Sequence, residues 1–137
     1  MTTVELSDWQ AALNRLSGAR RILVLAATDL GKSSFIREAL QRLGPELRLL
    51  DLDPGQKMIG PPGTVGLGSM AGAEVRIERF RFVGTTRGSS LRQILGAASL
   101  LARASPGAWI ANTSGFVRGP GERLQLLTVE ALQPDLI

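Results

Sequence analysis

The stretch Arg21–Phe35, RILVLAATDLGKSSF, decides the fold that this sequence predicts. Its apolar run at 22–27 is typical of a strand that is buried on both faces. A loop with Gly31 and Lys32 follows, and apolar residues then recur at helical spacing up to the Gly-Pro pair at 44–45, where we expect the helix to end. A strand, a tight loop with Gly-Lys-Ser and a helix are the context of a phosphate-binding loop.

The loop and the first turn of this helix predict a nucleotide-binding site. Their backbone N–H groups would form a concave, positive site for phosphate oxygens. Lys32 adds a full charge for the outer phosphates, and the hydroxyl of Ser33 is a ligand of the type that holds Mg²⁺. The predicted cofactor-binding residues are Thr28, Asp29, Leu30, Gly31, Lys32, Ser33 and Ser34.

One observation limits this interpretation, and one alternative to it remains. The consensus G-x-x-x-x-G-K-[ST] begins with a glycine where this chain has Ala26, and alanine tolerates a positive φ less well than glycine. The alternative is an ordinary strand, turn and helix with a lysine in the first helical turn.

The composition excludes several kinds of chemistry. The chain has 137 residues, enough for one domain with a real core, and it contains neither cysteine nor histidine. Disulfides, thiolate nucleophiles, Cys/His zinc sites and serine–histidine triads are therefore excluded. Any catalysis must rest on carboxylates, lysine, arginine, hydroxyls and a metal held by oxygen. The net charge of +4, carried almost entirely by arginine, is by itself weak support for a nucleic-acid partner.

The sequence also indicates where the protein resides. No apolar run approaches membrane-spanning length, and the first residues, MTTVELSDW, lack a basic leader. We therefore expect a cytoplasmic protein.

A second apolar strand at 47–53 ends in two carboxylates, Asp51 and Asp53. Strand alternation would point both to the same side, beside the phosphate loop. Ligands of open α/β sheets sit beyond the carboxyl ends of the strands, so a carboxylate here would handle Mg²⁺ or the proton of a nucleophile. The alternative is a strand that simply stops at the turn formed by 54–56.

The rest of the chain reads as alternating strands and helices. We expect helices at Ser7–Leu16, capped by Ser7 with Gln10, after Ser90, capped by Ser90 with Gln93, and at 122–132. We expect a short strand near 64–67, a bulge or two short strands around 78–79, a buried strand at 108–112 and the start of another strand at 135. Arg76, Arg79 and Arg81 are interpreted as a solvated edge. The pattern predicts a single α/β domain with a mainly parallel sheet, in which 1–18 forms an N-terminal helix and 21–137 the binding core. It also suggests that the sheet lacks at least one strand.

The glycine-rich loop 113–121 has two readings that the composition leaves even. In one, Phe116 stacks on a base and Arg118 meets a phosphate. In the other, the loop is only a turn that exposes an aromatic ring.

Four motifs in order, TDLGKSS, DLDPGQ with PPGTV, RFVGTT and NTSGFVRGPG with LQPDLI, resemble the RNA 5′-hydroxyl kinase family. This family includes the kinase subunit of the mRNA 3′-end cleavage factor and a kinase of ribosomal-RNA spacer processing. The resemblance covers about 21–137. It implies a three-layer P-loop NTPase fold and transfer of the γ-phosphoryl group of ATP, with Mg²⁺, to the 5′-OH of single-stranded RNA or DNA.

Carried over to this chain, the resemblance assigns phosphate and Mg²⁺ binding to Lys32 and Ser33. It makes Asp53 the acidic residue that activates the 5′-hydroxyl or supports the metal, and it places Gln56 near the end of the substrate. The substrate-binding clasp corresponds to Thr113, Gly115 and Phe116, with Arg118 at an RNA phosphate.

Departures from the family pattern leave two further hypotheses open. Phe116 stands where the family usually has tryptophan, and the arginine-bearing lid would lie beyond the strand that starts at Asp135. Without a lid from another chain, weak catalysis or none is expected, because such an arginine is worth about 10³-fold or more in rate. The chain would then be a non-catalytic nucleotide- or RNA-binding module. An unrelated P-loop ATPase or GTPase is disfavoured by the clasp-like loop and by the lack of an NKxD motif.

Overall fold

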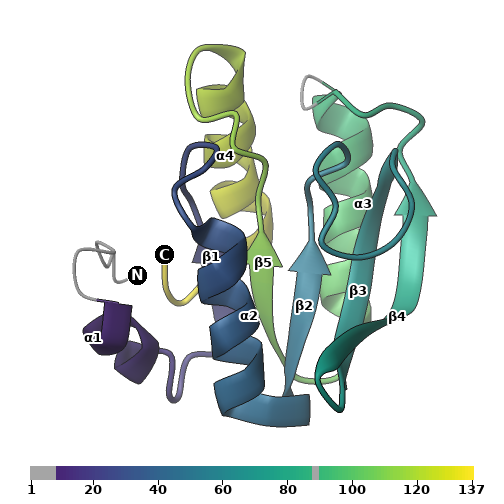
Figure 1. Cartoon of the computed structure of the whole chain (residues 1–137). Coiled ribbons are helices and arrows are strands. Elements are labelled where there is room, and N and C mark those ends of the chain that lie inside the picture. Colours follow the sequence, from purple (N-terminus) through teal and green to yellow (C-terminus); the bar gives the residue numbers. More distant parts are fainter. Residues whose placement is uncertain (1–8, 88–89) are drawn as a thin grey trace.

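The structure is a computed structural model that describes residues 9–87 and 90–137. In this part of the chain, one mixed sheet of five strands has the order β1-β5-β2-β3-β4 (Figure 1). β1, β5 and β2 are parallel to one another, whereas β3 is antiparallel to both β2 and β4. The strands are β1 (Arg21–Val24), β2 (Leu47–Asp51), β3 (Thr64–Ala71), β4 (Glu74–Phe82) and β5 (Ala108–Asn112).

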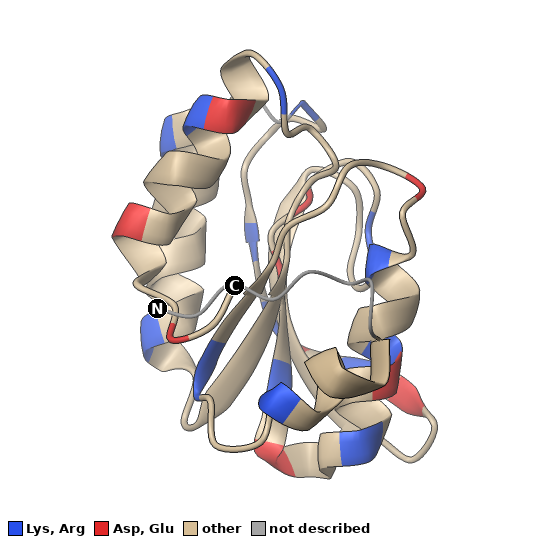
Figure 2. Ribbon diagram, turned by 90° about the vertical axis from the view of Figure 1, so that its left-hand side faces the viewer, with Lys and Arg blue, Asp and Glu red and all other residues tan. Residues whose placement is uncertain are grey.

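Helices cover both faces of this sheet, and the edge-on view of Figure 2 shows the sheet between two helical layers. They are α1 (Trp9–Arg15), α2 (Lys32–Leu43), the short 3₁₀ helix η1 (Gly44–Glu46), α3 (Leu91–Ala104) and α4 (Pro120–Leu132). α1 and α2 pack on one face, and α3 and α4 on the other. The predicted three-layer α/β fold is confirmed, and the parallel part of the sheet consists of β1, β5 and β2.

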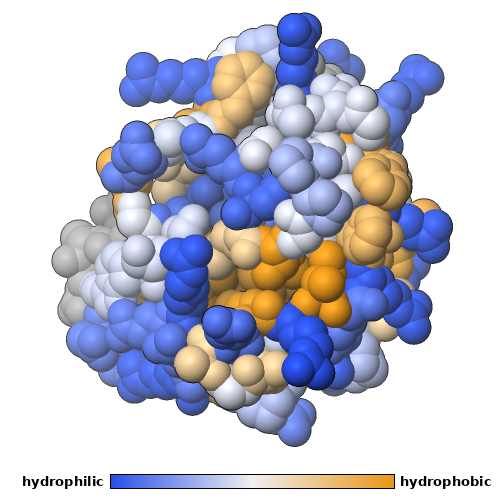
Figure 3. Space-filling model, turned by 45° about the vertical axis from the view of Figure 1, so that its right-hand side comes forward, coloured by the Kyte–Doolittle hydropathy of each residue, from blue (hydrophilic) through white to orange (hydrophobic). Residues whose placement is uncertain are grey.

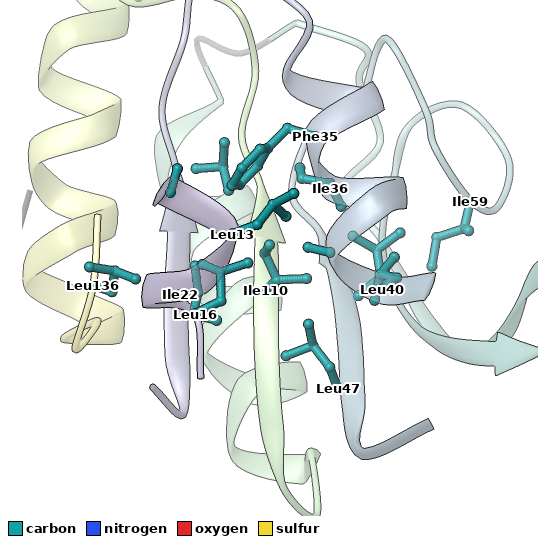
Figure 4. Packing of buried hydrophobic residues seen from close by; sticks show 14 residues of the cluster. Leu13, Leu16, Ile22, Phe35, Ile36, Leu40, Leu47, Ile59, Ile110 and Leu136 are labelled. Carbon is teal, nitrogen blue, oxygen red and sulfur yellow. The ribbon is translucent and has the colours of Figure 1, made fainter. Parts of the chain in front are cut away.

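The packing explains why α2 is held rigidly beside the central strands. Phe35, Ile36 and Leu40 of α2 meet Ile110 of β5 and Leu13 of α1 in one buried cluster (Figure 4). On α2, Phe35 and Ala39 are four positions apart, as are Ile36 and Leu40, so these buried residues form a single stripe that faces the sheet. Among the described helices, none combines the length and the apolar character needed to cross a membrane.

Several local predictions agree with the structure, and one does not. The bulge predicted around 78–79 is present, because the pairing of β3 with β4 shifts between Leu67 and Gly68 and leaves Glu78 without an opposite residue. Ser90 directly precedes α3, but its side chain makes no capping hydrogen bond, so the capping box predicted with Gln93 is wrong. The box predicted at Ser7 with Gln10 begins outside the described residues.

The last residues of the chain add to the sheet beside β1. Leu136 forms a parallel bridge with Ile22, and the N–H of Leu23 donates to the carbonyl of Leu136 at 2.9 Å. Arg21 and Asp135 join the same two segments through an ion pair of 2.7 Å. The predicted start of a strand at Asp135 therefore corresponds to real pairing with β1.

Candidate nucleotide site

The loop between β1 and α2 has the backbone geometry of an anion cradle. Asp29 and Gly31 take positive φ values of 64° and 79°, and α2 begins at Lys32 with no side chain capping its first turn. The free N–H groups of this turn therefore remain open to an anion. Ala26 is not among the residues with positive φ, so the missing consensus glycine is not needed for the loop to form.

Lys32 is the first residue of α2, directly after Gly31 of this cradle, and is only 9% exposed. Burial lowers the pKa of its ammonium group, and the negative charges of Asp53 and, to a lesser extent, Asp51 oppose that shift. Lys32 and the acidic end of β2 therefore share one electrostatic environment. Ser33, next in the chain, is half-buried.

Asp51 has a structural task that the sequence does not reveal. Its fully buried carboxylate accepts hydrogen bonds from the N–H groups of Met58 and Ile59 at 2.8 and 3.1 Å. It also accepts from the Nδ2 group of Asn112 at 2.9 Å, and it pairs with the buried ammonium of Lys57 at 3.0 Å. These contacts occupy both oxygens, so Asp51 anchors the loop after β2 and has little capacity left for a metal.

Asp53 keeps one oxygen available. Its Oδ1 accepts from the N–H groups of Gly55 and Gln56 at 2.9 and 3.1 Å, whereas its Oδ2 accepts no hydrogen bond from any described residue. The prediction that Asp51 and Asp53 share a side relied on strand alternation, but β2 ends at Asp51. The fold of the turn, rather than the strand, places Asp53 near Lys32.

The loop after β5 packs directly on the phosphate loop. The hydroxyl of Thr113 donates to the carbonyl of Val24 at 2.8 Å. Gly115 lies so close to Thr28 that an added β-carbon would be 2.7 Å from the Thr28 nitrogen. The loop after β5 therefore contacts the end of β1 through Thr113 and the phosphate loop through Gly115.

Phe116 and Arg118 continue this loop toward solvent. Gln125 of α4 donates to the carbonyl of Phe116 at 3.3 Å, and the Phe116 ring, 43% exposed, lies against Gly121. Arg118 is exposed and has no acidic partner among the described residues. Gln56 is exposed as well, and neither the Gln56 nor the Arg118 side chain forms a hydrogen bond or an ion pair with a described residue.

Asn112 is a site residue that the sequence analysis did not single out. It ends β5 between the phosphate-loop strand and the acidic strand, opposite Val24 and Asp51. Its Nδ2 group donates to Asp51, while its Oδ1 is buried with no hydrogen-bond partner in the described part of the chain. A buried acceptor without a partner is a candidate contact for a bound group or for an ordered water. A polar residue at the carboxyl end of a central apolar strand was the available signal.

The residues present fit a nucleotide with Mg²⁺. No group of three acidic, histidine or cysteine side chains that would hold a metal by itself occurs among the described residues. Mg²⁺ instead favours one or two carboxylates together with substrate phosphates. The hydroxyl of Ser33 and the free Oδ2 of Asp53 match that donor set.

P-loop domains have a three-layer α/β fold in which the first strand leads, through an anion-binding loop, into a helix. The fold described above is of this class. The family profile described as mRNA cleavage and polyadenylation factor CLP1 P-loop matches residues 26–137, and the chain belongs to this family. The resemblance drawn from the motifs is thereby confirmed.

Proteins with related sequences carry one functional name. The polyribonucleotide 5′-hydroxyl-kinase of Thermococcus kodakarensis is 32% identical over 131 residues, covering 85% of this chain and 36% of that protein. The Danio rerio protein named polyribonucleotide 5′-hydroxyl-kinase Clp1 is 32% identical over 146 residues, covering 85% of this chain and 31% of that protein. A polyribonucleotide 5′-hydroxyl-kinase of Pyrococcus horikoshii is 28% identical over 145 residues, covering 95% of this chain and 40% of that protein. The chain therefore spans a third to two fifths of the length of these relatives.

Proposed function

We propose that residues 21–137 form the nucleotide- and substrate-binding core of an ATP-dependent polynucleotide 5′-hydroxyl kinase. The observation that carries this proposal is the buried Lys32, which begins α2 directly after the open anion cradle and whose ammonium lies within the electrostatic influence of Asp53. A cation beside open N–H groups suits a triphosphate, and a carboxylate across from it suits the hydroxyl that attacks. The names of the related kinases support the same reaction.

In this proposal each group has a defined task. The N–H groups at 28–34 and the Lys32 ammonium bind the phosphates of ATP and offset the charge on the transferred group. The 5′-hydroxyl oxygen forms a bond to the γ-phosphorus while the bond from that phosphorus to the β,γ-bridging oxygen breaks, and ADP leaves. The proton of the hydroxyl passes to the free Oδ2 of Asp53.

Mg²⁺, when bound by the Ser33 hydroxyl together with the phosphates, would supply further charge neutralisation. In the alternative assignment the Oδ2 of Asp53 would hold the metal instead of taking the proton. Asn112 would position the site through its fixed contact with Asp51 and its free carbonyl oxygen. Of the clasp residues, Phe116 would hold the polynucleotide end, while Thr113 and Gly115 would fix the loop that carries it; Gln56 and Arg118 would contact the polynucleotide from the rim. Neither histidine nor cysteine is required for this chemistry.

A non-catalytic nucleotide- or RNA-binding module is the second candidate. The part of the related kinases that this chain matches is only a third to two fifths of their length, so the match by itself does not assign every catalytic group to these residues. Groups that complete catalysis in those proteins can lie in the parts that this chain does not match. The second candidate predicts ATP binding without transfer.

One experiment separates the two candidates. The protein is incubated with γ-labelled ATP, Mg²⁺ and a 5′-hydroxyl oligonucleotide, and label on the oligonucleotide is measured beside ATP affinity. We expect Lys32→Ala to abolish both label transfer and tight ATP binding. Asp53→Asn should abolish transfer while ATP affinity stays largely intact, because it removes a proton acceptor but little volume. Asp135→Asn, an exposed carboxylate at the opposite end of β1, is the matched control.

The outcomes are distinct. Lys32-dependent labelling establishes the kinase, and ATP binding without labelling establishes the module. Equal loss of ATP affinity and transfer in Asp53→Asn would refute the proton-acceptor role of Asp53.

A further inference from the structure

We propose that the edge strand β4 is a binding track for single-stranded nucleic acid, along which a polynucleotide runs away from the acidic turn at Asp53. The inference rests on the proposed function, because it assigns a path to the chain whose 5′ end that function places at Asp53. It concerns a surface separate from the clasp at 113–118.

Two phenylalanines form an exposed aromatic pair on this strand. Phe80 is 44% and Phe82 is 74% exposed, and their ring centroids lie 5.5 Å apart at an interplanar angle of 81°. As residues two apart on one strand, they project from the same face of the sheet. Their partners on β3 are Gly66 and Thr64, whose side chains are too small to cover the rings. Exposed aromatic rings of this kind are the surfaces on which successive bases of a single strand stack.

Three arginines on the same strand remain free for phosphates. Arg76, Arg79 and Arg81 are exposed, and none of them has an acidic partner in the described part of the chain. Glu78 of β4 pairs with Arg48 of β2 at 3.3 Å, and Glu74, the other carboxylate of this strand, forms no ion pair with a described residue, so these three arginines keep their charges available. Unpaired guanidinium groups are well suited to phosphate oxygens.

The arginines and the aromatic rings lie along the same exposed edge of the sheet. Arg79 and Arg81 pair with the buried Leu67 and Val65, and thus lie on the opposite face of β4 from Phe80 and Phe82. Because β4 is the outermost strand, both faces end at a single open edge (Figure 1). A polynucleotide on this edge can place bases over the rings and phosphates toward the guanidinium groups.

The track is continuous with the proposed reaction site. β4 and β2 run in the same direction, since both are antiparallel to β3, so Phe82 ends at the edge of the sheet that carries Asp53. The chain after β4 touches the acidic turn, where a β-carbon at Gly55 would lie 2.9 Å from the carbonyl oxygen of Thr86. Two strand spacings, about 10 Å, separate β4 from β2. A nucleic-acid chain longer than a few nucleotides can therefore reach both places.

A protein segment is the competing occupant of this edge. Figure 3, in which the β4 side comes forward, shows an apolar area framed by hydrophilic side chains, and Ile77 of β4 is 36% exposed. An apolar area alone would fit a protein partner. The unbalanced arginines beside an aromatic pair favour a polyanion with flat bases.

The experiment measures binding of fluorescent 5′-hydroxyl oligouridylates, a trinucleotide and a 12-mer, by anisotropy in the absence of ATP. We expect Phe82→Ala to weaken 12-mer binding about tenfold, because loss of base stacking on one ring is worth about that factor. Phe82→Trp should restore it. The trinucleotide should lose less affinity than the 12-mer, because it can bind at the acidic turn without occupying the whole of β4. Leu126→Ala, which removes an exposed apolar side chain of α4, is the matched control.

The arginines are tested through the dependence on salt. Arg79→Ala combined with Arg81→Ala should reduce the slope of log affinity against log salt for the 12-mer by about 1.4, since each phosphate contact of a single strand contributes about 0.7. Arg103→Ala on α3 is the control for loss of charge.

If Phe82→Ala binds the 12-mer as tightly as the unaltered protein, the proposal that β4 binds nucleic acid is refuted, and the edge of β4 is then better explained as a contact for a protein segment. Equal weakening of the trinucleotide and the 12-mer would also overturn it. Failure of the proposed function is visible separately, as missing ATP binding or missing label transfer, in assays that do not depend on β4.

Discussion

Replacing Gly115 by alanine tests whether the loop after β5 supports the phosphate loop. A β-carbon at this position would lie 2.7 Å from the nitrogen and 2.9 Å from the Cα of Thr28, and it would meet the Thr28 hydroxyl even more closely. The hydroxyl can rotate away, but the backbone atoms cannot. Ordinary contact begins at 3.4 Å, so the two loops must separate by about 0.7 Å.

The expected size of the effect follows from this displacement. Overpacking of a buried contact costs about 1–3 kcal/mol, so we expect a clear fall in thermal stability. A shift of the Thr28 backbone also moves N–H groups away from the phosphates. Loss of one hydrogen bond to a charged group costs about 1.5–3 kcal/mol, which corresponds to a ten- to hundredfold loss of ATP affinity.

ATP affinity is measured by calorimetry, and stability by thermal unfolding of the same samples. Gly96→Ala is the matched control, because a β-carbon at Gly96 meets no described atom within 4 Å and the residue lies inside α3. That change should stabilise the protein by about 0.5–1 kcal/mol and leave ATP affinity unaltered. If Gly115→Ala binds ATP as tightly as the unaltered protein, the two loops do not support each other.

Three further predictions concern Phe116, Lys32 and the ion pair of Arg21 with Asp135. Phe116→Ala should weaken oligonucleotide binding more than ATP binding, because the half-exposed ring offers a stacking surface; no change in either would remove the clasp assignment. ATP affinity should be full below the lowered pKa of Lys32 and decline as pH rises through it, since bound phosphates favour the charged form; calorimetry from pH 7 to 10 should show this slope, and Lys32→Met should abolish it. The contact with Arg21 lowers the pKa of Asp135, so its small stabilising effect should be present above the usual carboxyl pKa of about 3.9 and vanish as pH falls through the lowered value. Urea midpoints of Asp135→Asn and the unaltered protein should then differ at pH 7 but converge in acid; a difference that persists in acid would contradict this.

The sequence alone determined the elements whose signals are local. The buried strand at 108–112 coincides with β5, and the helix after the phosphate loop ends at Gly44, which takes a positive φ of 69°. Apolar runs, helical spacing and glycine stops lie within a few residues of one another, so a one-dimensional reading captures them. The phosphate loop was found for the same reason, because its seven residues are contiguous.

Only the tertiary structure decided how the two carboxylates divide their tasks. Asp51 and Asp53 look equivalent in the sequence, yet Asp51 is saturated by groups from the loop after β2 and by Asn112, which lies 61 positions away. Asp53 keeps an oxygen free because its own turn occupies only Oδ1. The order β1-β5-β2, which inserts the last strand between the first two, brings these groups together. Strand order depends on pairing between distant segments, and such pairing leaves no local pattern in the chain.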